Sequence, residues 1–244
     1  MSFLGLIKRA TNRVLMSWLN HRIEYATSIP DFGRLVVHLQ SAQLTPKTIF
    51  DVGVADGTPW LYDTFPQAHF FLFDPTPQSL PYMNSVAKRL KADVFNLALG
   101  DKSGTISLNV WREHSDSSIF DEVGHADILE RRDVPMRRFD ELVVSFARPS
   151  LMKIDVQGAE LMVLRGMGER LKEIDCLIVE TSLIATVHDG PEFTEIAGFM
   201  KDAGFVLFDI VAVIRRPLDL ALAQMDAVFV PERSPLRRDH RWAA

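Results

Sequence analysis

Four short runs of mostly apolar residues in this chain each end on a carboxylate, at 48–51, 70–74, 151–155 and 177–180. Runs this short, rich in aromatic and β-branched residues and followed by helical patterns, are typical of buried parallel strands. Open α/β sheets bind their ligands beyond the carboxyl ends of the strands. We therefore expect the four acids to gather at one edge of a sheet, where a cationic or hydroxyl-rich ligand would bind.

Strand and helix patterns alternate from about residue 48 onward. Strands are predicted at 48–53, 69–74, 94–99, 151–155 and 176–181, with helices from about 58 and over 83–90, 159–171 and 193–203. The last two apolar segments, 205–213 and 227–230, can pair antiparallel across the loop that contains Arg215 and Arg216. The alternation predicts an α/β fold with a doubly wound, Rossmann-like and mostly parallel sheet and an antiparallel last strand.

The middle of the chain departs from this alternation. A hairpin strand is predicted at 105–111 and a short segment at 134–139, with a polar stretch over 112–133 between them. Long irregular stretches inside compact domains are commonly binding loops or lids. We expect this stretch to cover a bound ligand, and the alternative is a surface loop.

Both ends of the chain lie outside the α/β pattern, so three parts are predicted: an N-terminal helical segment (1–45), the α/β domain (46–232) and a basic tail (233–244). Apolar residues recur near the N-terminus at helical spacing, with Lys8 and Arg9 among them. These two charges interrupt the segment long before the roughly 18 residues that a membrane span requires. The helix is expected to pack on the domain or on a second copy in a homodimer, and peripheral contact with an anionic membrane is the alternative.

The amino-acid composition and net charge indicate which class of ligand or partner the chain binds. The chain has 244 residues, of which 47% are hydrophobic, enough for one large domain with a proper core. Its formal net charge of -5 argues against nucleic acid, which needs a basic face, and favours a small-molecule or saccharide acceptor. The single cysteine, Cys176, excludes an internal disulfide, so a cytoplasmic location is the default expectation.

The loop after the first predicted strand reads D-V-G-V-A-D-G over residues 51–57. The two glycines, Gly53 and Gly57, allow a tight strand-to-helix connection that a ligand can approach closely. Val52, which precedes Gly53, is expected to line the same site. A dinucleotide would place two phosphates here, where Asp51 and Asp56 are negative and no Lys or Arg is present. A cationic sulfonium without phosphate, S-adenosylmethionine, is expected instead, and a purely structural turn is the alternative.

Asp74 ends the second strand, where an acid can accept hydrogen bonds from both ribose hydroxyls of an adenosine. With Pro75 it could also be a helix N-cap followed by proline at the first helical position. Ala98 and Leu99 end the next strand and are expected beside the adenine. Asp93 or Asn96 could bond the exocyclic amine, or either could be an ordinary turn residue.

Several of these stretches together resemble one known family. They are the loop 51–57, F-D-P at 73–75, L-A-L-G-D at 97–101, the serines 117–118, K-I-D-V-Q-G-A-E at 153–160 and I-V-E at 178–180. The pattern is similar to that of FkbM-type S-adenosylmethionine-dependent methyltransferases over about residues 48–230. It departs at Ala55, where the family usually has Asn, and at Asp74, where Glu is usual. The resemblance implies a class I methyltransferase fold, O-methylation of a sugar or natural-product hydroxyl, and Ser118 near the cofactor.

Three residues are candidates for the catalytic step. Asp155 ends the fourth strand and could serve as the base, or could orient the acceptor or the cofactor's amino group. Lys153 points to the same face, and an ion pair between them would weaken that base. Glu180, at the end of the next strand, could bind acceptor hydroxyls or share the role, and His188 follows in a loop.

Other sequence features leave further alternatives. Glu160, in the first turn of a helix, is expected to be a cap. No tight ligand spacing supports a metal site, so none is predicted. The two rival functions are a non-catalytic module that binds S-adenosylmethionine and a nicotinamide-dependent oxidoreductase.

Overall fold

The computed structural model describes residues 30–110, 118–120, 130–142 and 145–241. The chain divides into two units, Met1–Asp31 and Phe32–Ala244. The first falls almost wholly outside the described residues, as does the amphipathic helix predicted near the N-terminus. In the part of the chain that is described, no helix is long and apolar enough to span a bilayer.

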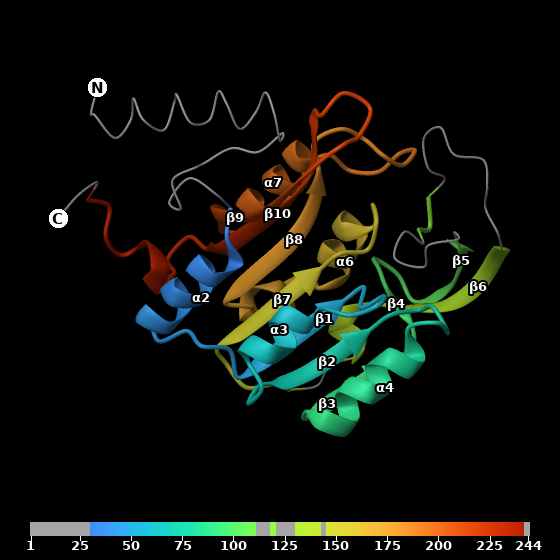
Figure 1. Ribbon diagram of the computed structural model, residues 1–244, viewed down its shortest axis with the longest axis horizontal. Coiled ribbons are helices and arrows are strands. Elements are labelled where there is room, and N and C mark those ends of the chain that lie inside the picture. The colour runs from blue at the N-terminus through green and yellow to red at the C-terminus, as the bar shows by residue number, and fades with distance from the viewer. Residues whose placement is uncertain (1–29, 111–117, 121–129, 143–144, 242–244) are drawn as a thin grey trace, which may run out of the picture. The chain divides into compact units, whose positions relative to one another are not determined.

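A seven-stranded sheet forms the centre of the second unit (Figure 1). Its strands are β1 (Thr48–Val52), β2 (His69–Phe73), β3 (Ala92–Phe95), β7 (Ser150–Ile154), β8 (Cys176–Ser182), β9 (Phe205–Arg215) and β10 (Leu222–Pro231). Their order is β3-β2-β1-β7-β8-β10-β9. Neighbours are parallel except at β10, which runs antiparallel to both β8 and β9. The doubly wound sheet with an antiparallel last strand is confirmed.

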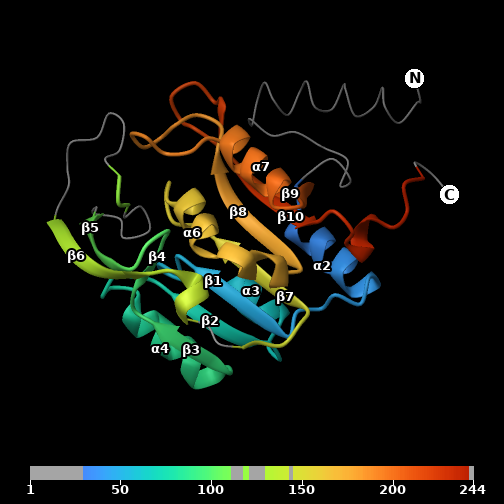
Figure 2. The same cartoon turned by 180° about the vertical axis from the view of Figure 1, so that it is seen from behind.

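Two apolar cores lie on opposite faces of this sheet, because successive side chains of a strand point to opposite sides. Ile49 and Leu151 pack with α2 (Phe32–Ser41), α3 (Pro59–Thr64) and α4 (Leu80–Arg89) on one face. Phe50 and Met152 pack with α5 (Phe139–Leu142), α6 (Glu160–Gly166) and α7 (Phe193–Asp202) on the other. Figure 2 shows the sheet from behind, with helices on both sides of it. Layers on both faces leave the carboxyl ends of the strands as the open edge.

A second, three-stranded sheet lies beside the first, in the order β4 (Ala98–Leu99), β6 (Glu130–Arg137) and β5 (Gly104–Val110). The predicted single strand at 94–99 is therefore wrong. After β3 the Asn96 side chain donates to the backbone carbonyls of Asp74 and Thr76, at 2.8 and 3.1 Å, and the chain turns away to pair with β6. The end of the predicted irregular stretch also differs, because residues 130–133 belong to β6 and pair with β5. Residues 112–117 and 121–129 of that stretch lie outside the described residues.

The predicted helix at 159–171 is shorter than expected. The α-helix α6 ends at Gly166, and a 3-10 helix, η3 (Gly168–Glu173), replaces the rest. Gly168 has a φ of 54°, a left-handed conformation that an α-helix cannot contain. In the predicted tail, a second 3-10 helix, η4 (Pro235–Arg237), is capped by Ser234.

Candidate active site

The loop that follows β1 lies at the open edge of the large sheet. Gly53 has a φ of 85° and donates its N–H to the carbonyl of Phe73, at 2.9 Å. A Cβ atom at this position would stand 1.8 Å from the backbone oxygen of Asp155. Only glycine therefore allows the loop to pass between the ends of β2 and β7.

A cavity of about 260 Å³ opens above this loop. Every predicted cofactor residue lines it except Asp51 and Ser118. One wall is apolar, made by Phe73, Leu97, Leu99, Leu108 and Met136. The ionisable lining consists of Asp56, Asp74, Asp155 and Lys153 among the described residues. Three carboxylates against one ammonium leave the cavity negative, which suits a cationic ligand and disfavours a pyrophosphate.

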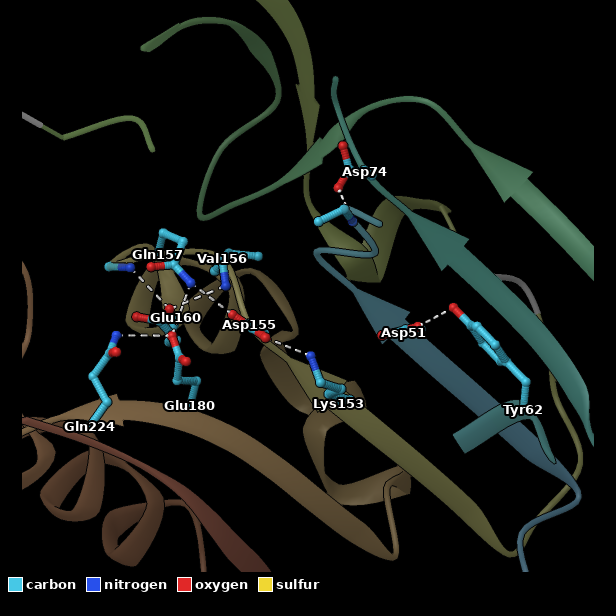
Figure 3. A network of polar contacts seen from close by, with 12 residues as sticks. Asp51, Tyr62, Asp74, Lys153, Asp155, Val156, Gln157, Glu160, Glu180 and Gln224 are labelled. Carbon is cyan, nitrogen blue, oxygen red and sulfur yellow. Dashed lines mark hydrogen bonds and ion pairs between the residues drawn. The ribbon is translucent and has the colours of Figure 1, made fainter. Parts of the chain in front are cut away.

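Asp74 organises the turn at the end of β2 as well as facing the cavity. Its Oδ1 accepts the backbone N–H of Thr76, at 2.8 Å, and the hydroxyls of Thr76 and Ser79. Its Oδ2 accepts the backbone N–H of Ala55, at 2.8 Å (Figure 3). Because α4 begins only at Leu80, Asp74 is not its N-cap and Pro75 is not its first residue. A carboxylate oxygen has two lone-pair positions, so Oδ2 retains one acceptor position.

The two residues proposed for the adenine amine are occupied elsewhere. Asn96 holds the turn after β3, as described above, and does not line the cavity. The carboxylate of Asp93 lies 2.8 Å from Nε2 of His69, at the opposite end of β2 from the cavity. The expectation that one of them meets an adenine amine is therefore wrong for Asp93 and unsupported for Asn96. Ala98 and Leu99 do line the cavity.

Asp51 is fully buried behind the cavity wall and does not line it. Its carboxylate accepts a hydrogen bond from the Tyr62 hydroxyl of α3 (Figure 3). Burial raises its pKa, although Lys153 and the Tyr62 hydroxyl act in the opposite direction. The expectation that Asp51 meets the cofactor is thus not matched by its position: the side chain faces the helices α2 to α4 rather than the open edge.

Lys153 and Asp155 form a close ion pair on β7 and the loop that follows it. The ammonium Nζ lies 2.7 Å from Asp155 Oδ2, and Lys153 is only 7% exposed (Figure 3). Burial alone would lower the pKa of Lys153, but the charges of Asp155 and Asp51 raise it above its ordinary value. Lys153 is therefore charged, paired with Asp155 and further stabilised by the charge of Asp51. The ion pair that the sequence left as an alternative is present.

Gln157 connects Asp155 to Glu180. Its Nε2 lies 3.1 Å from Asp155 Oδ1 and 3.1 Å from Glu180 Oε2 (Figure 3). The backbone of Gln157 is left-handed, with a φ of 51°, and Gln224 of β10 donates to the same Glu180 oxygen at 3.2 Å. Glu180 does not line the cofactor cavity. The structure thus brings Asp155 and Glu180 together through an amide rather than by direct contact.

Glu160 is buried in the first turn of α6 and accepts the backbone N–H groups of Val156 and Gly158, at 3.2 and 3.0 Å. Burial raises its pKa to about 7, against the effect of these hydrogen bonds. It shapes the loop after β7 rather than capping α6, because both N–H groups precede the helix and no side chain caps the helix N-terminus. The expected role as a cap is therefore wrong.

The buried side chain of Glu180 is expected to make the stability of the protein depend on pH. Burial, followed by the charges of Asp155 and Glu160, raises its pKa from 4.5 to about 9. A carboxyl with a raised pKa in the folded state contributes stability that is present below pH 4.5 and lost as the pH rises through 9. Glu180→Gln, which mimics the neutral form, is expected to flatten this loss.

The melting temperatures of the wild type and of Glu180→Gln are measured between pH 6 and pH 10. His, Cys and Tyr side chains also titrate over about this range, so a control substitution is needed. The exposed Glu169→Gln on η3 is the matched control. Parallel curves for the wild type and Glu180→Gln would contradict the assignment.

Ser118 and His188 lie apart from the cofactor cavity. The Ser118 hydroxyl donates to the carbonyl of Gln157, at 2.6 Å, and so ties the segment 118–120 to the loop after β7. His188 lies in a second, neighbouring cavity together with Ser107, Arg131 and Asp189. Neither His188 nor Glu180 lines the cofactor cavity, so Asp155 is the one catalytic candidate of the three that does.

Several functional contacts escaped the sequence reasoning. Tyr62 lies on α3 and Gln224 on β10, and nothing in their local sequence marks them as partners of Asp51 and Glu180. Gln157 lies inside the K-I-D-V-Q-G-A-E stretch, two residues after Asp155. That position could have indicated a contact with the Asp155 carboxylate. No group of three or more His, Cys, Asp or Glu side chains suited to a metal occurs among the described residues.

This strand order, with β10 antiparallel and a cavity over the carboxyl ends of β1, β2 and β7, defines a class I S-adenosylmethionine-dependent methyltransferase. The family model described as the methyltransferase FkbM domain matches residues 51–207, well over half of the chain. The chain belongs to the FkbM methyltransferase family, and its cofactor is S-adenosylmethionine.

Among characterised relatives, the chain is 27% identical over 143 residues to the hexuronic acid methyltransferase AglP of Haloferax volcanii. The match covers 56% of this chain and 54% of that protein, so it spans about half the length of the relative.

Two solved methyltransferases are similar in structure. One is the 1,6-didemethyltoxoflavin-N1-methyltransferase of Burkholderia thailandensis, with 12% identity, coverage of 95% and 91% of the two chains, and a TM-score of 0.40. The other is the magnesium protoporphyrin IX methyltransferase of Synechocystis, with 10% identity, coverage of 95% and 98%, and a TM-score of 0.41.

Proposed function

We propose that this methyltransferase transfers the methyl group to a hydroxyl oxygen of a saccharide. The observation that carries the proposal is the position of Asp155, an acid held by Lys153 that lines the cofactor cavity at the end of β7. A hydroxyl acceptor must lose a proton during transfer, and a carboxylate at the methyl-donor site can receive it. The match to a hexuronic acid methyltransferase supports a saccharide as the acceptor.

The cofactor residues divide along the cavity by chemistry. Asp74 Oδ2, with its remaining acceptor position, would accept one ribose hydroxyl, while Oδ1 is committed to Thr76 and Ser79. The apolar wall that includes Leu97 and Leu99 suits a flat heterocycle such as adenine. Val52, Gly53, Asp56, Gly57 and Pro75 would line the rest of the cofactor, with the acids favouring its positive charge.

Asp155 and its neighbours would then carry the transfer step. S-adenosylmethionine supplies an activated methyl group, and the oxygen must be held about 3 Å from it on the line of displacement. Lys153 and Gln157 hold the two carboxylate oxygens of Asp155, which fixes the direction in which it can accept a proton. Glu180, with a pKa of about 9, is neutral at pH 7 and would support Gln157 instead of acting as the base. His188 is the alternative base.

The experiment is a transfer assay with S-adenosylmethionine that carries an isotopic label in its methyl group, offered with glycans extracted from cells that lack the gene. Mass spectrometry should find label in a saccharide, and the product should survive mild alkali, as a methyl ether does. Label released by alkali would identify a carboxylate acceptor and contradict the hydroxyl assignment. Binding of S-adenosylmethionine without transfer of its methyl group to any glycan would favour a non-catalytic module that binds the cofactor.

A further inference from the structure

A second cavity, the one that His188 lines, adjoins the cofactor cavity. Its volume of about 290 Å³ is comparable to the 260 Å³ of the cofactor cavity, so a ring-sized group can enter it. Ile119 lines both cavities, which places them on either side of one side chain. A molecule held in the second cavity can therefore lie next to the methyl-donor site.

One wall of this cavity is the outer face of the small sheet. Asn109 of β5 and Arg131 of β6 are directly opposite each other in the antiparallel register, so their side chains share a face. The Asn109 amide donates to the carbonyl of Phe120, at 3.0 Å, and the Ser118 hydroxyl donates to Gln157. These two bonds attach the segment 118–120 to the small sheet on one side and to the cofactor loop on the other.

The opposite wall is the loop that carries His188 and Asp189. A Cβ atom on Gly158 would stand 2.6 Å from Val187 and 3.3 Å from Phe120, so these three residues are closely packed. Val187 is itself buried, and its neighbours His188 and Asp189 line the cavity. Both walls are therefore attached to the loop between β7 and α6 that also carries Asp155 and Gln157.

The charges of the two cavities differ. The cofactor cavity has three carboxylates and one ammonium, whereas the second has one guanidinium, one imidazole and one carboxylate among the described residues. A guanidinium binds a carboxylate through two parallel hydrogen bonds, and a carboxylate such as Asp189 accepts hydrogen bonds from sugar hydroxyls. A ligand with both groups on one ring would match this lining.

We propose that the second cavity is the acceptor subsite and that it selects a saccharide bearing a carboxylate, with Arg131 as the residue that recognises the acid. The proposal rests on the saccharide transfer proposed above and specifies its substrate class. Asp189 and His188 would bind the ring hydroxyls, and the hydroxyl to be methylated would point past Ile119 toward Asp155.

Isothermal titration tests this without turnover. The protein is first saturated with S-adenosylhomocysteine and then titrated with the methyl glycosides of glucuronic, galacturonic and mannuronic acid and with their neutral hexose counterparts. At least one acidic glycoside should bind about tenfold or more tightly than the corresponding neutral hexose glycoside. The neutral glycoside has no carboxylate and therefore cannot form the charged hydrogen bonds with Arg131. Equal affinities, or no binding of any acidic glycoside, would overturn the proposal.

Substitutions on one strand sharpen the test. Arg131→Gln should remove the preference for the acid while leaving the binding of S-adenosylhomocysteine unchanged. Arg132→Gln is the matched control, because Arg132 is the next residue of β6, points to the other face and pairs with Glu130. A preference that survives Arg131→Gln, or that Arg132→Gln removes equally, would contradict the role of Arg131.

The two proposals fail separately. Transfer of methyl groups to neutral saccharides with no preference for acids would leave the proposed function intact and overturn only the subsite. Failure to bind S-adenosylhomocysteine in the first titration would instead contradict the cofactor assignment.

Discussion

Asp155→Asn is expected to lower the rate of methyl transfer by about 10²–10⁴-fold, the usual contribution of a positioned general base. Asparagine keeps the shape of the side chain, and its one amide oxygen can accept from Lys153, but it cannot accept the proton of the acceptor hydroxyl. Affinity for S-adenosylmethionine should stay close to that of the wild type. Single-turnover kinetics with the labelled cofactor and a titration of the same variant provide the two measurements.

Asp63→Asn is the control for this substitution, because it removes one carboxylate from an exposed position on α3. It should leave both rate and affinity unchanged. Normal turnover in Asp155→Asn would remove Asp155 from the mechanism and direct attention to His188. A loss of cofactor affinity with unchanged turnover at saturation would show that Asp155 orients the cofactor and is not the base.

Lys153→Met is expected to lower the free energy of unfolding by about 3–5 kcal/mol, the usual effect of removing one partner from a buried ion pair. Asp155, which is partly buried, loses its ion-pair partner, and the fully buried Asp51 loses a nearby positive charge. Protonation of Asp51 would relieve part of the cost, since burial already raises its pKa. The deficit should therefore shrink as the pH falls. Denaturant unfolding at neutral and acidic pH measures both effects.

Lys172→Met is the matched control, because it breaks an ion pair with Glu169 in which both side chains are largely exposed. Its cost should stay below about 1 kcal/mol. If the two substitutions cost the same, Lys153 is not the centre of a buried charge cluster.

The sequence predicted the large sheet well because its information is local. Strands β1, β2, β7 and β8 are short apolar runs, and the acids at 74 and 155 come directly after the strands β2 and β7, where they face the open edge. Asp51 looked equivalent but is not. Strand β1 continues to Val52, so Asp51 is still inside the sheet, and alternation turns it toward the helices. In the register Asp51 lies opposite Leu72 and Lys153, two residues before the level of Asp74 and Asp155, and this depth in the sheet keeps it from the ligand.

The remaining features of the site depend on contacts between distant parts of the chain. The split of the predicted strand at 94–99 comes from Asn96 bonding to a turn about twenty residues earlier and from pairing with β6. Glu180 acquires its raised pKa from burial and from Asp155 and Glu160, and its amide partner Gln224 is 44 residues away. No local pattern records such contacts, so the sequence could nominate the acids but not their protonation or partners.

The most direct test of the central claim compares the binding of two adenosine-containing ligands to the purified full chain. An acid-lined cavity should bind S-adenosylmethionine, with its positive sulfonium, and reject NAD, with its two negative phosphates. Isothermal titration with each ligand at low ionic strength, where charge effects are least screened, makes the contrast largest. The account predicts saturable binding of S-adenosylmethionine and none of NAD. Binding of NAD without binding of S-adenosylmethionine would contradict it.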